Sequence, residues 1–343
     1  MMERIISFSD AVNEAMRLAM QRDKNVILMG EDIAGGATLP HLTDSEAWGG
    51  CLGVTKGLVQ EFGRERVLDT PITEAGFIGA AMGAAATGLR PIAELMFNDF
   101  IGTCLDQVMN QGAKFRYMFG GKAKVPVTIR TAHGAGFRAA AQHSQSLYGM
   151  VASIPGLKVV VPSNPYDAKG LLLSAIEDDD PVFFFEDKTL YTMKGNVPEG
   201  YYTIPLGKAE VKRNGSDVTI VAIGKQVHTA MEAAEILAKK GIQAEIVDPR
   251  SISPLDEDMI LRSVEKTNRL VIVDEANPRC SVATDIAALV ADKGFDFLDA
   301  PIKRVTAPHT PVPFSAVLED LYLPSPEKIV QAVYEMIGEP VLA

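Results

Sequence analysis

Short apolar runs rich in β-branched and aromatic residues recur along this chain and alternate with stretches of helical periodicity. This alternation is typical of βαβ units. Because the runs are apolar on both faces, they suit parallel strands buried between two layers of helices. We therefore predict an α/β fold with mostly parallel sheets. The expected strands of the first half are 26–29, 126–130, 157–162 and 181–186, and those of the second half begin at 218, 243, 269 and 301.

Length and local composition predict two domains. The 343 residues exceed the usual limit of one hydrophobic core. Between residues 191 and 205 (YTMKGNVPEGYYTIP) periodicity is lost and Gly, Pro and Tyr accumulate, which indicates a linker. We expect a first domain over 1–190, a linker over 191–205 and a second domain over 206–343. The expected helices are an N-terminal one capped by Ser7 and Asp10, 165–176 with Asn164 as N-cap, 226–240, 257–266 and 282–293.

Composition excludes several classes of protein. A net charge of -11 without a basic cluster disfavours a nucleic-acid partner. No apolar stretch approaches the roughly 20 residues that span a bilayer, and the N-terminus has no signal-peptide core, so we expect no membrane insertion and a cytoplasmic location. The cysteines, Cys51, Cys104 and Cys280, are scattered and lack zinc-site spacing, which favours reduced thiols.

A carboxylate stands at the start of a predicted helix, in DTPITEAGF at 69–77. Thr73 is the expected N-cap and residues 75–88 form the helix, so Glu74 falls in the first turn. The helix dipole stabilises its anion, whereas dry apolar neighbours raise a carboxyl pKa. A carboxyl balanced between these effects exchanges a proton near neutral pH, as an acid/base catalyst does. An acidic residue that merely stabilises a first turn is the alternative.

The same helix is unusually rich in small residues. Glycine weakens a helix by about 1 kcal/mol relative to alanine, so several glycines need a compensating reason. That reason is close approach of another backbone or a ligand, or else tight packing in a core. The small residues form two stripes, Gly76, Gly79 and Gly83 on one and Ala80, Ala84 and Gly88 on the other.

A glycine-rich motif, GAGFRA at 134–139, follows the strand that ends near Arg130 and matches G-x-G-x-x-A. A dinucleotide site also needs an acidic residue at the end of the following strand. That strand ends instead in VPSN at 161–164. An NAD site is therefore disfavoured against a glycine-rich turn that lets the chain pass close to a neighbour.

His143 follows this motif among polar residues, unlike a core histidine. A pKa near 6.5 suits histidine for proton transfer, and beside Glu74 it would be a second acid/base group. A hydrogen-bonded structural histidine is the alternative. The remaining histidines lack metal-ligand spacing and are interpreted as structural or surface residues: His41, His133, His228 and His309.

Several motifs are absent from the sequence: a P-loop, a G-x-S-x-G elbow and the Gly-Asp-Gly segment that holds a magnesium diphosphate. Six segments together resemble the E1 β subunits of thiamine-diphosphate-dependent 2-oxo acid dehydrogenase complexes. This resemblance spans nearly the whole chain and implies a transketolase-like pyrimidine-binding domain followed by a transketolase C-terminal domain. The segments are 69–77, GLRPI at 88–92, DQV at 106–108, AQHSQ at 141–145, PGLKVV at 155–160 and DPR at 248–250.

The resemblance assigns roles to four residues. It implies that Glu74 hydrogen-bonds N1′ of the aminopyrimidine and favours the imino tautomer, which takes the proton from thiazolium C2. Phe100 corresponds to an aromatic residue against the pyrimidine ring, and Ile72 lines the same pocket. His143 corresponds to a histidine that assists acyl transfer to the lipoyl disulfide. The cofactor stores the carbanion while the protein orients it.

The resemblance also implies a potassium site and partners. Ala175, Ile176, Asp178 and Asp180 stand where some relatives bind a structural potassium ion, Asp180 replacing an amide; a solvated helix end over 177–180 is the alternative. Without Gly-Asp-Gly, the chain holds half of the cofactor. An α subunit then supplies the Mg²⁺-bound diphosphate in an α2β2 tetramer, and a lipoyl-bearing E2 acyltransferase accepts the acyl group. The glycine-striped helix is a candidate for packing across subunits.

The substrate is predicted from a narrower resemblance, to acetoin dehydrogenase β subunits. Pyruvate-type relatives tend to have a glycine-rich stretch at 277–282. We therefore predict cleavage of acetoin to an acetyl unit and acetaldehyde, with pyruvate or a branched 2-oxo acid as the alternative. A non-catalytic transketolase-like partner is another alternative, against which Glu74 and His143 together argue. The segments are DSEAWGG at 44–50, AGFRAAAQH at 135–143, DEANPRCS at 274–281 and PHTPVPF at 308–314.

Overall fold

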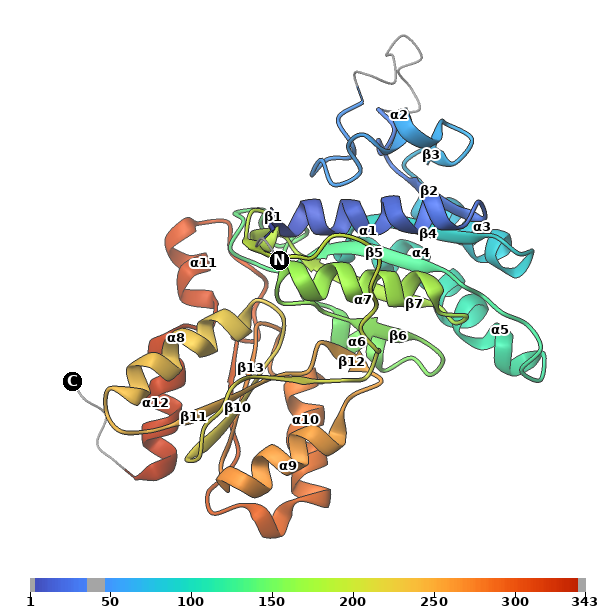
Figure 1. The fold of residues 1–343 in the computed structure, drawn as a ribbon. Helices are drawn as coiled ribbons and strands as arrows, with labels where there is room; N and C mark the ends of the chain where they lie inside the picture. The colour runs from blue at the N-terminus through green and yellow to red at the C-terminus, as the bar shows by residue number, and fades with distance from the viewer. Residues whose placement is uncertain (1–3, 36–46, 339–343) are drawn as a thin grey trace. The chain divides into compact units, whose positions relative to one another are not determined.

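The structure, a computed structural model, describes residues 4–35 and 47–338. The chain forms two compact units (Figure 1). The first comprises the chain up to His133 and residues 151–206, and the second comprises residues 134–150 and the chain from Gly207 onward. Segment 134–150 therefore packs within the second unit, whereas the division predicted from the sequence places it in the first domain. His41 and residues 44–46 lie outside the described residues.

The first unit is built on a parallel sheet with strand order β6-β7-β5-β4-β2-β3. Helices α1 and α7 lie side by side on one face of the sheet. On the opposite face, α3 packs against β4 and against α4 (Figure 1). The elements are β1 (Ile5–Ser7), α1 (Phe8–Arg22), β2 (Val26–Gly30), α2 (Leu58–Phe62), β3 (Val67–Asp69), α3 (Glu74–Ala86), β4 (Arg90–Phe97), η2 (Asn98–Phe100), α4 (Ile101–Asp106), the π-helical η3 (Gln107–Gly112), α5 (Ala113–Met118), β5 (Thr128–His133), β6 (Lys158–Val160), α7 (Pro165–Glu177), β7 (Val182–Asp187), η4 (Lys188–Leu190) and β8 (Lys194–Asn196); α6 (Tyr148–Ala152) spans the boundary between segments of the two units.

The second unit has its own sheet, of order β14-β13-β10-β11-β9, in which β9 is antiparallel to β11 and the other pairs are parallel. Helices α8 and α12 share one apolar core with the sheet, and α9 and α10 cover the other face (Figure 1). The elements are β9 (Glu210–Arg213), β10 (Val218–Ala222), α8 (Gln226–Ala238), β11 (Ala244–Asp248), β12 (Ser251–Ser253), α9 (Glu257–Thr267), β13 (Leu270–Asp274), α10 (Val282–Lys293), η5 (Phe295–Phe297), β14 (Lys303–Thr306), α11 (Ala316–Tyr322) and α12 (Pro326–Ile337).

Local sequence explains where the main helices begin. Ser7 caps α1 and forms a capping box with Asp10, and Asn164 caps α7 by accepting a hydrogen bond from the Asp167 amide, 2.9 Å away. Both caps were predicted. The predicted strands and second-domain helices are also present, with ends that differ by a few residues. The α/β class is confirmed.

The stretch 191–205, predicted to be a linker, is an ordered part of the first unit. It contains β8, which pairs antiparallel with β1. The Tyr202 ring stacks on Tyr166 with centroids 4.9 Å apart, and the Ile204 amide donates to the Gly170 carbonyl at 3.2 Å. The loss of periodicity therefore marks an irregular chain that is packed rather than free.

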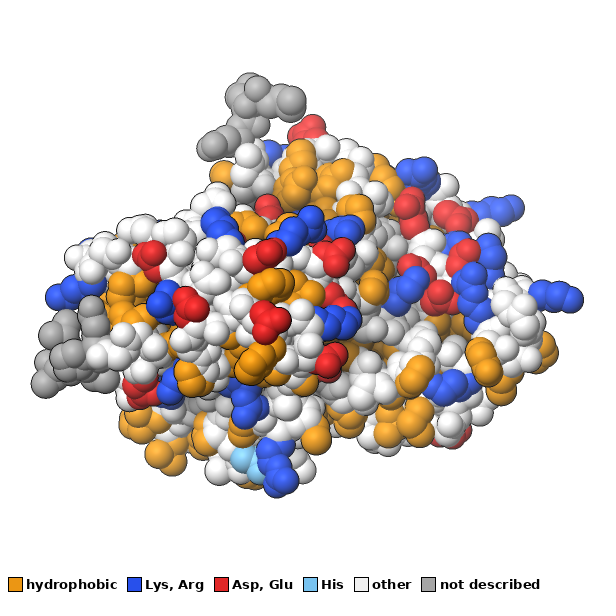
Figure 2. Space-filling model, turned by 90° about the horizontal axis from the view of Figure 1, so that it is seen from below, with side chains coloured by type: hydrophobic (Ala, Val, Ile, Leu, Met, Phe, Trp, Pro, Cys, Tyr) orange, Lys and Arg blue, Asp and Glu red, His pale blue; other side chains and the backbone are white. Residues whose placement is uncertain are grey.

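None of the helices within 4–35 and 47–338 is long and apolar enough to cross a membrane. On the face drawn in Figure 2, basic and acidic side chains are interspersed with hydrophobic ones and no basic area dominates.

Candidate functional site

The first sheet offers a ligand site where its strands β2 and β4 end. The two strands are neighbours, but the chain leaves β2 toward β3 on one side and leaves β4 toward β5 on the other. This divergence is a topological switch point, where α/β sheets bind ligands beyond the carboxyl ends of the strands. Glu31 follows β2 directly, and residues 98–100 follow β4.

Glu74 opens α3, which begins after a short turn that follows β3. Thr73 occupies the N-cap position as predicted, but its side chain makes no capping hydrogen bond. The Glu74 carboxylate is half-buried, and its Oε2 lies 3.3 Å from the Thr103 hydroxyl. The same hydroxyl lies 2.8 Å from the carbonyl oxygen of Phe100. Thr103 thus links Glu74 to the backbone at Phe100.

Two apolar residues are assigned to this site. Ile72 is close to Glu74 in sequence, and Phe100 is connected to Glu74 by the Thr103 hydroxyl. Ile72 is 84% exposed, unusual for isoleucine. Phe100 is half-buried and packs edge to face against Phe97, with ring centroids 5.7 Å apart. An aromatic ring, an exposed aliphatic side chain and a half-buried carboxylate are the groups that an aminopyrimidine needs for packing and hydrogen bonding. These side chains of the first unit therefore match the half of thiamine diphosphate that the resemblance assigns to them.

Glu31 is a functional candidate that the sequence analysis missed. Its side chain is 6% exposed, and its buried Oε1 has no hydrogen-bond partner among the described residues. Burial, then repulsion by Glu74, Asp32 and Glu94, raises the pKa of Glu31 to about 7. The sequence signal was available, because Glu31 directly follows the fully buried strand VILMG.

A buried ion-pair cluster links the neighbouring strands β4, β5 and β7 near this edge of the sheet. The Arg130 guanidinium on β5 donates to both carboxylate oxygens of Glu186, at 2.7 and 2.8 Å, and to Glu94 at 2.8 Å. The Tyr191 hydroxyl donates to Glu186 at 2.9 Å. Burial alone would lower the pKa of Arg130, but the two carboxylates raise it, whereas burial raises the pKa of Glu94. One guanidinium therefore faces two carboxyl groups in a dry environment.

The carboxyl groups around the switch point repel one another and would repel a diphosphate. The pKa of Glu31 responds to the charges of three of them, Glu74, Asp32 and Glu94. A phosphate group needs cations or helix N-terminal amides instead. This side of the site therefore suits a neutral heterocycle that hydrogen-bonds to a carboxylate better than it suits a phosphate group.

The glycine-rich motif at 134–139 opens no helix. The backbone is irregular from the end of β5 to Tyr148, where α6 begins. The amides of Gly136 and Arg138 donate to the buried carboxylate of Glu319, at 2.7 and 3.2 Å. Since a carboxylate of the chain occupies the amides that a phosphate would need, the motif is the glycine-rich turn and not a dinucleotide site.

His143 lies in this irregular segment of the second unit. It is half-buried, and its amide donates to the Ala140 carbonyl at 3.5 Å. Ala140 and Arg138 both have positive φ, 59° and 60°, so the turn before His143 is tightly constrained. Glu74 belongs to the other unit, and pairing of the two as acid and base stays a prediction.

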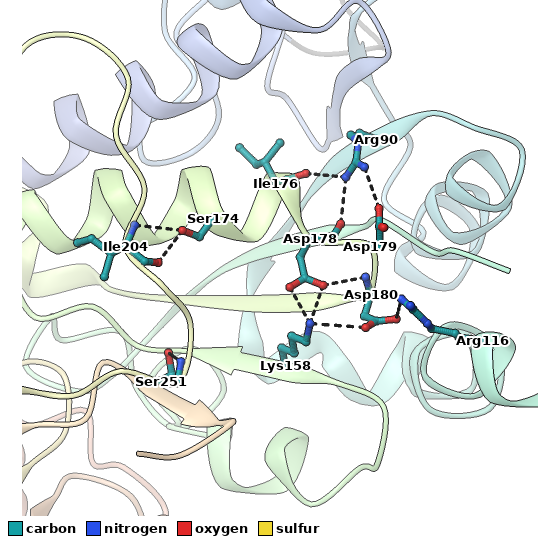
Figure 3. Close-up of polar contacts among 11 residues, drawn as sticks. Arg90, Arg116, Lys158, Ser174, Ile176, Asp178, Asp179, Asp180, Ile204 and Ser251 are labelled. Carbon is teal, nitrogen blue, oxygen red and sulfur yellow. Dashed lines mark hydrogen bonds and ion pairs between the residues drawn. The ribbon is translucent and has the colours of Figure 1, made fainter. Parts of the chain in front are cut away.

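The oxygens assigned to potassium lie at the end of α7, where the chain's own cations contact them (Figure 3). The Ala175 carbonyl accepts from the Asp178 amide at 3.3 Å. The Arg90 guanidinium donates to the carbonyls of Ile176 and Asp178, at 3.1 and 3.0 Å. Two of the four expected ligands are therefore engaged by a guanidinium through their carbonyl oxygens.

The carboxylates of this region are paired as well. Lys158 Nζ lies 2.7 and 2.6 Å from the two carboxylate oxygens of Asp178, and Arg116 lies 2.9 Å from Asp180 (Figure 3). Arg90 and Lys124 both contact Asp179, and Lys124 first, then Arg90, lowers the pKa of Asp179. Three carboxylates thus face four cationic side chains: Arg90, Arg116, Lys124 and Lys158. This set fits a further cation poorly.

Two family models and several known proteins match this chain over most of its length. The model of the transketolase pyrimidine-binding domain matches residues 4–194, and that of the transketolase C-terminal domain matches residues 207–329. The chain is 77% identical over 341 residues to the acetoin:2,6-dichlorophenolindophenol oxidoreductase subunit beta of Bacillus subtilis, covering 99% of this chain and 100% of the relative. It is 60% identical to the protein of that name from Cupriavidus necator, covering 96% and 97%.

More distant matches extend the pattern. The pyruvate dehydrogenase E1 component subunit beta of B. subtilis is 43% identical, with 95% of this chain and 97% of the relative covered. Among solved structures, the inactive beta4 tetramer of a split gene transketolase aligns with a TM-score of 0.76 and 22% identity, covering 97% of this chain and 98% of that chain. This last likeness shows the shared fold.

Proposed function

Because this chain belongs to the family of E1 β subunits built from a transketolase pyrimidine-binding domain and a transketolase C-terminal domain, we propose that it is the β subunit of a thiamine-diphosphate-dependent acetoin dehydrogenase. The observation that carries the proposal is 77% identity to an acetoin oxidoreductase β subunit over 99% of the chain. Relatives that act on 2-oxo acids, at 41–45% identity, make pyruvate or a branched 2-oxo acid the second candidate substrate.

In this proposal the first unit holds the aminopyrimidine half of the cofactor. Glu74 would share a hydrogen bond with the ring nitrogen N1′, and the proton in this bond is the one that the tautomer change requires. Thr103, 3.3 Å from Glu74 Oε2, orients the carboxylate. Phe100 packs against the ring, and Ile72 covers its edge and loses its exposure on assembly.

Thiamine diphosphate, when bound, supplies the carbon nucleophile and electron sink that the chain lacks. The bond between the carbonyl and carbinol carbons of acetoin breaks, and the carbinol carbon leaves as acetaldehyde. The remaining two-carbon unit would reduce and acetylate a lipoyl disulfide, or it would give two electrons to dichlorophenolindophenol and leave as acetate after addition of water. His143 is the proposed proton carrier for transfer to the lipoyl sulfur.

The proposal requires partners. The carboxyl groups near Glu74 repel phosphate, so an α subunit holds the diphosphate through Mg²⁺ in an α2β2 tetramer, and a lipoyl-bearing E2 accepts the acetyl unit. A structural potassium ion is not part of the proposal, because the oxygens of Ile176, Asp178 and Asp180 already pair with Arg90, Lys158 and Arg116.

The test is co-expression with an α subunit and measurement of acetoin-dependent dichlorophenolindophenol reduction and acetaldehyde release, with and without thiamine diphosphate. Activity that needs the cofactor and is lost in Glu74→Ala supports cofactor role and substrate together. Turnover of pyruvate with inert acetoin would retain the family role and overturn the substrate. A stable tetramer inactive on both would overturn the mechanism.

A further inference from the structure

The second unit contains a cavity of about 270 Å³ beside the carboxyl ends of β13 and β14. Three loops line it, one within 141–147, one directly after β13 and one directly after β14. β13 lies next to β10, and the chain leaves β10 toward β11 on the opposite side. The cavity therefore adjoins the switch point of the second sheet, where ligands of α/β folds bind.

The three loops come from segments that resemble acetoin-type β subunits. Ala141 belongs to 135–143, Ala276 and Asn277 belong to 274–281, and residues 309–312 belong to 308–314. These segments are separate in sequence, and the fold brings them to one cavity. The features that set the sequence apart from 2-oxo acid relatives are thereby gathered around one space that a ligand can fill.

The polar side chains of the cavity are amides, hydroxyls and one imidazole. Gln145, Ser146, Asn277, His309 and Thr310 line it, and the lining includes no lysine or arginine. Asn277 Oδ1 is buried and has no hydrogen-bond partner among the described residues. A buried carbonyl oxygen without a donor is costly, and a ligand hydroxyl would satisfy it.

Two buried acidic side chains, Glu275 and Asp274, accept hydrogen bonds from the segment that lines the cavity. The Ser146 hydroxyl donates to Glu275 at 2.6 Å, and the Tyr148 hydroxyl donates to Asp274. Burial, then the charges of Glu275 and Asp274, raises the pKa of Tyr322, a lining residue, to about 12. A carboxylate ligand would lie near these acidic groups without a lysine or arginine in the lining, which disfavours it relative to a neutral ligand.

Two guanidinium groups of this unit, those of Arg304 and Arg138, are engaged by other groups of the chain. Arg304 donates at 2.8 Å to the carbonyl of Pro278 and to the hydroxyl of Thr284. Arg138 donates to Glu319 at 2.7 Å and to Asp320 at 2.6 Å. Neither residue lines the cavity.

The rest of the wall is apolar. Leu147, Ala276 and Val312 line the cavity together with the ring of Tyr322, and Val312 and Tyr322 belong to an apolar cluster with Ala135 and Ala307. Such walls accept methyl groups. A short ligand with apolar ends and hydrogen-bonding groups between them matches this lining.

We propose that this cavity of the second unit binds a small uncharged hydroxyketone and excludes the anionic 2-oxo acids. Asn277 Oδ1 accepts the ligand hydroxyl, and His309 and Thr310 supply donors for the carbonyl oxygen. The inference rests on the proposed function and deepens it by naming residues that separate acetoin from pyruvate.

Binding is tested on the assembled enzyme without thiamine diphosphate, so that no turnover occurs. Calorimetric titration uses butane-2,3-diol as the neutral probe and lactate as the anionic one. The diol binds and lactate does not; Asn277→Ala and His309→Ala each weaken diol binding about tenfold, as expected for one lost hydrogen bond. Arg279→Ala, at an exposed residue of the same turn that does not line the cavity, is the matched control and leaves binding unchanged. Equal diol binding by wild type and both variants overturns the inference, as does tighter binding of lactate.

Steady-state kinetics separate this inference from the proposed function. Asn277→Ala and His309→Ala raise KM for acetoin about tenfold with kcat within about twofold, because the groups act in binding. Thr310→Lys introduces a cation and lowers the preference for acetoin over pyruvate, measured as the ratio of kcat/KM values, about tenfold. His309 and Thr310 are exposed, so their variants test the cavity even where Asn277→Ala fails to fold. Wild-type turnover of acetoin with KM unchanged in the variants overturns the cavity and leaves the proposed function standing. Wild type inert toward acetoin overturns the proposed function, whereas diol binding that is lost in the variants still supports the cavity.

Discussion

The hydroxyl of Thr103 lies 3.3 Å from Oε2 of Glu74, and this contact joins α4 to the first turn of α3. The same hydroxyl is closer, at 2.8 Å, to the carbonyl oxygen of Phe100. The carboxylate that is expected to hold the cofactor is therefore oriented by a long hydrogen bond, and the aromatic residue is tied to the same hydroxyl.

The first prediction concerns this contact. Thr103→Val removes the hydroxyl and keeps the shape of the side chain, so the carboxylate loses its orientation but not its charge. We expect kcat for acetoin to fall roughly fivefold to tenfold, as a hydrogen bond of about 1 kcal/mol implies. Thr103→Ser retains the hydroxyl and serves as the control. Equal rates for the valine and serine variants would show that the hydroxyl does not position Glu74.

Glu31 gives the second prediction, a dependence of stability on pH. Burial and the charge of Glu74 raise the pKa of Glu31 from 4.5 to about 7 in the folded chain. The folded state therefore holds the proton more tightly, and stability is lost as pH rises from the unfolded pKa through the folded one. We expect the free energy of unfolding to fall by about 2–3 kcal/mol between pH 5 and pH 8 through this group.

Glu31→Gln removes the titration and supplies the comparison. The variant is expected to match wild type near pH 5 and to exceed it at pH 8, since glutamine needs no proton to stay neutral. Urea unfolding at several pH values measures the difference. Stability curves of the two proteins that run parallel from pH 5 to pH 8 would contradict the raised pKa.

The strands that the sequence analysis missed show where apolar patterns fail. β4 was not predicted, because Arg90, Pro91 and Glu94 interrupt its apolar run, yet it lies between β2 and β5 in the sheet. Glu94 is tolerated there since Arg130 on the next strand reaches it at 2.8 Å. β9, with sequence EVKR, is a charged antiparallel edge strand without an apolar pattern. Each of these depends on a long-range partner that local sequence does not reveal.

The candidate site was only partly predictable, because some of its residues also depend on partners distant in sequence. Glu74 was found because a local signal, a carboxylate in the first turn of a helix of small residues, coincided with a family resemblance. Glu31 was missed although it follows a buried strand, because two of the groups that raise its pKa, Glu74 and Glu94, lie far away in sequence. The potassium ligands were inferred from the family resemblance, and it does not reveal that Arg90, distant in sequence, donates to the carbonyl oxygens of Ile176 and Asp178.

The third prediction concerns the buried ion-pair cluster. Arg130→Met leaves Glu94 and Glu186 facing each other without a cation, and loss of one partner of a buried pair costs about 3–5 kcal/mol. Arg116→Met, at a partly exposed pair with Asp180, is the matched control and is expected to lower the unfolding midpoint much less. Urea unfolding midpoints compare the two variants. Equal midpoints for Arg130→Met and the control would show that the cluster adds little to stability.

The last prediction tests whether the glycine-striped helix packs against another subunit. A Cβ added at Gly83 would meet no atom of this chain within 4 Å, whereas one at Gly79 would lie 3.1 Å from Gln107. The chain itself therefore gives no reason for glycine at position 83, which costs about 1 kcal/mol of helix stability. Gly83→Leu is expected to keep or raise the stability of the isolated chain and to abolish assembly with the α subunit, because the bulky side chain blocks a close approach. Light scattering measures assembly, and Ala291→Leu, at an exposed alanine of α10, is the control. A Gly83→Leu variant that forms a tetramer of normal mass and activity would place the subunit contact elsewhere.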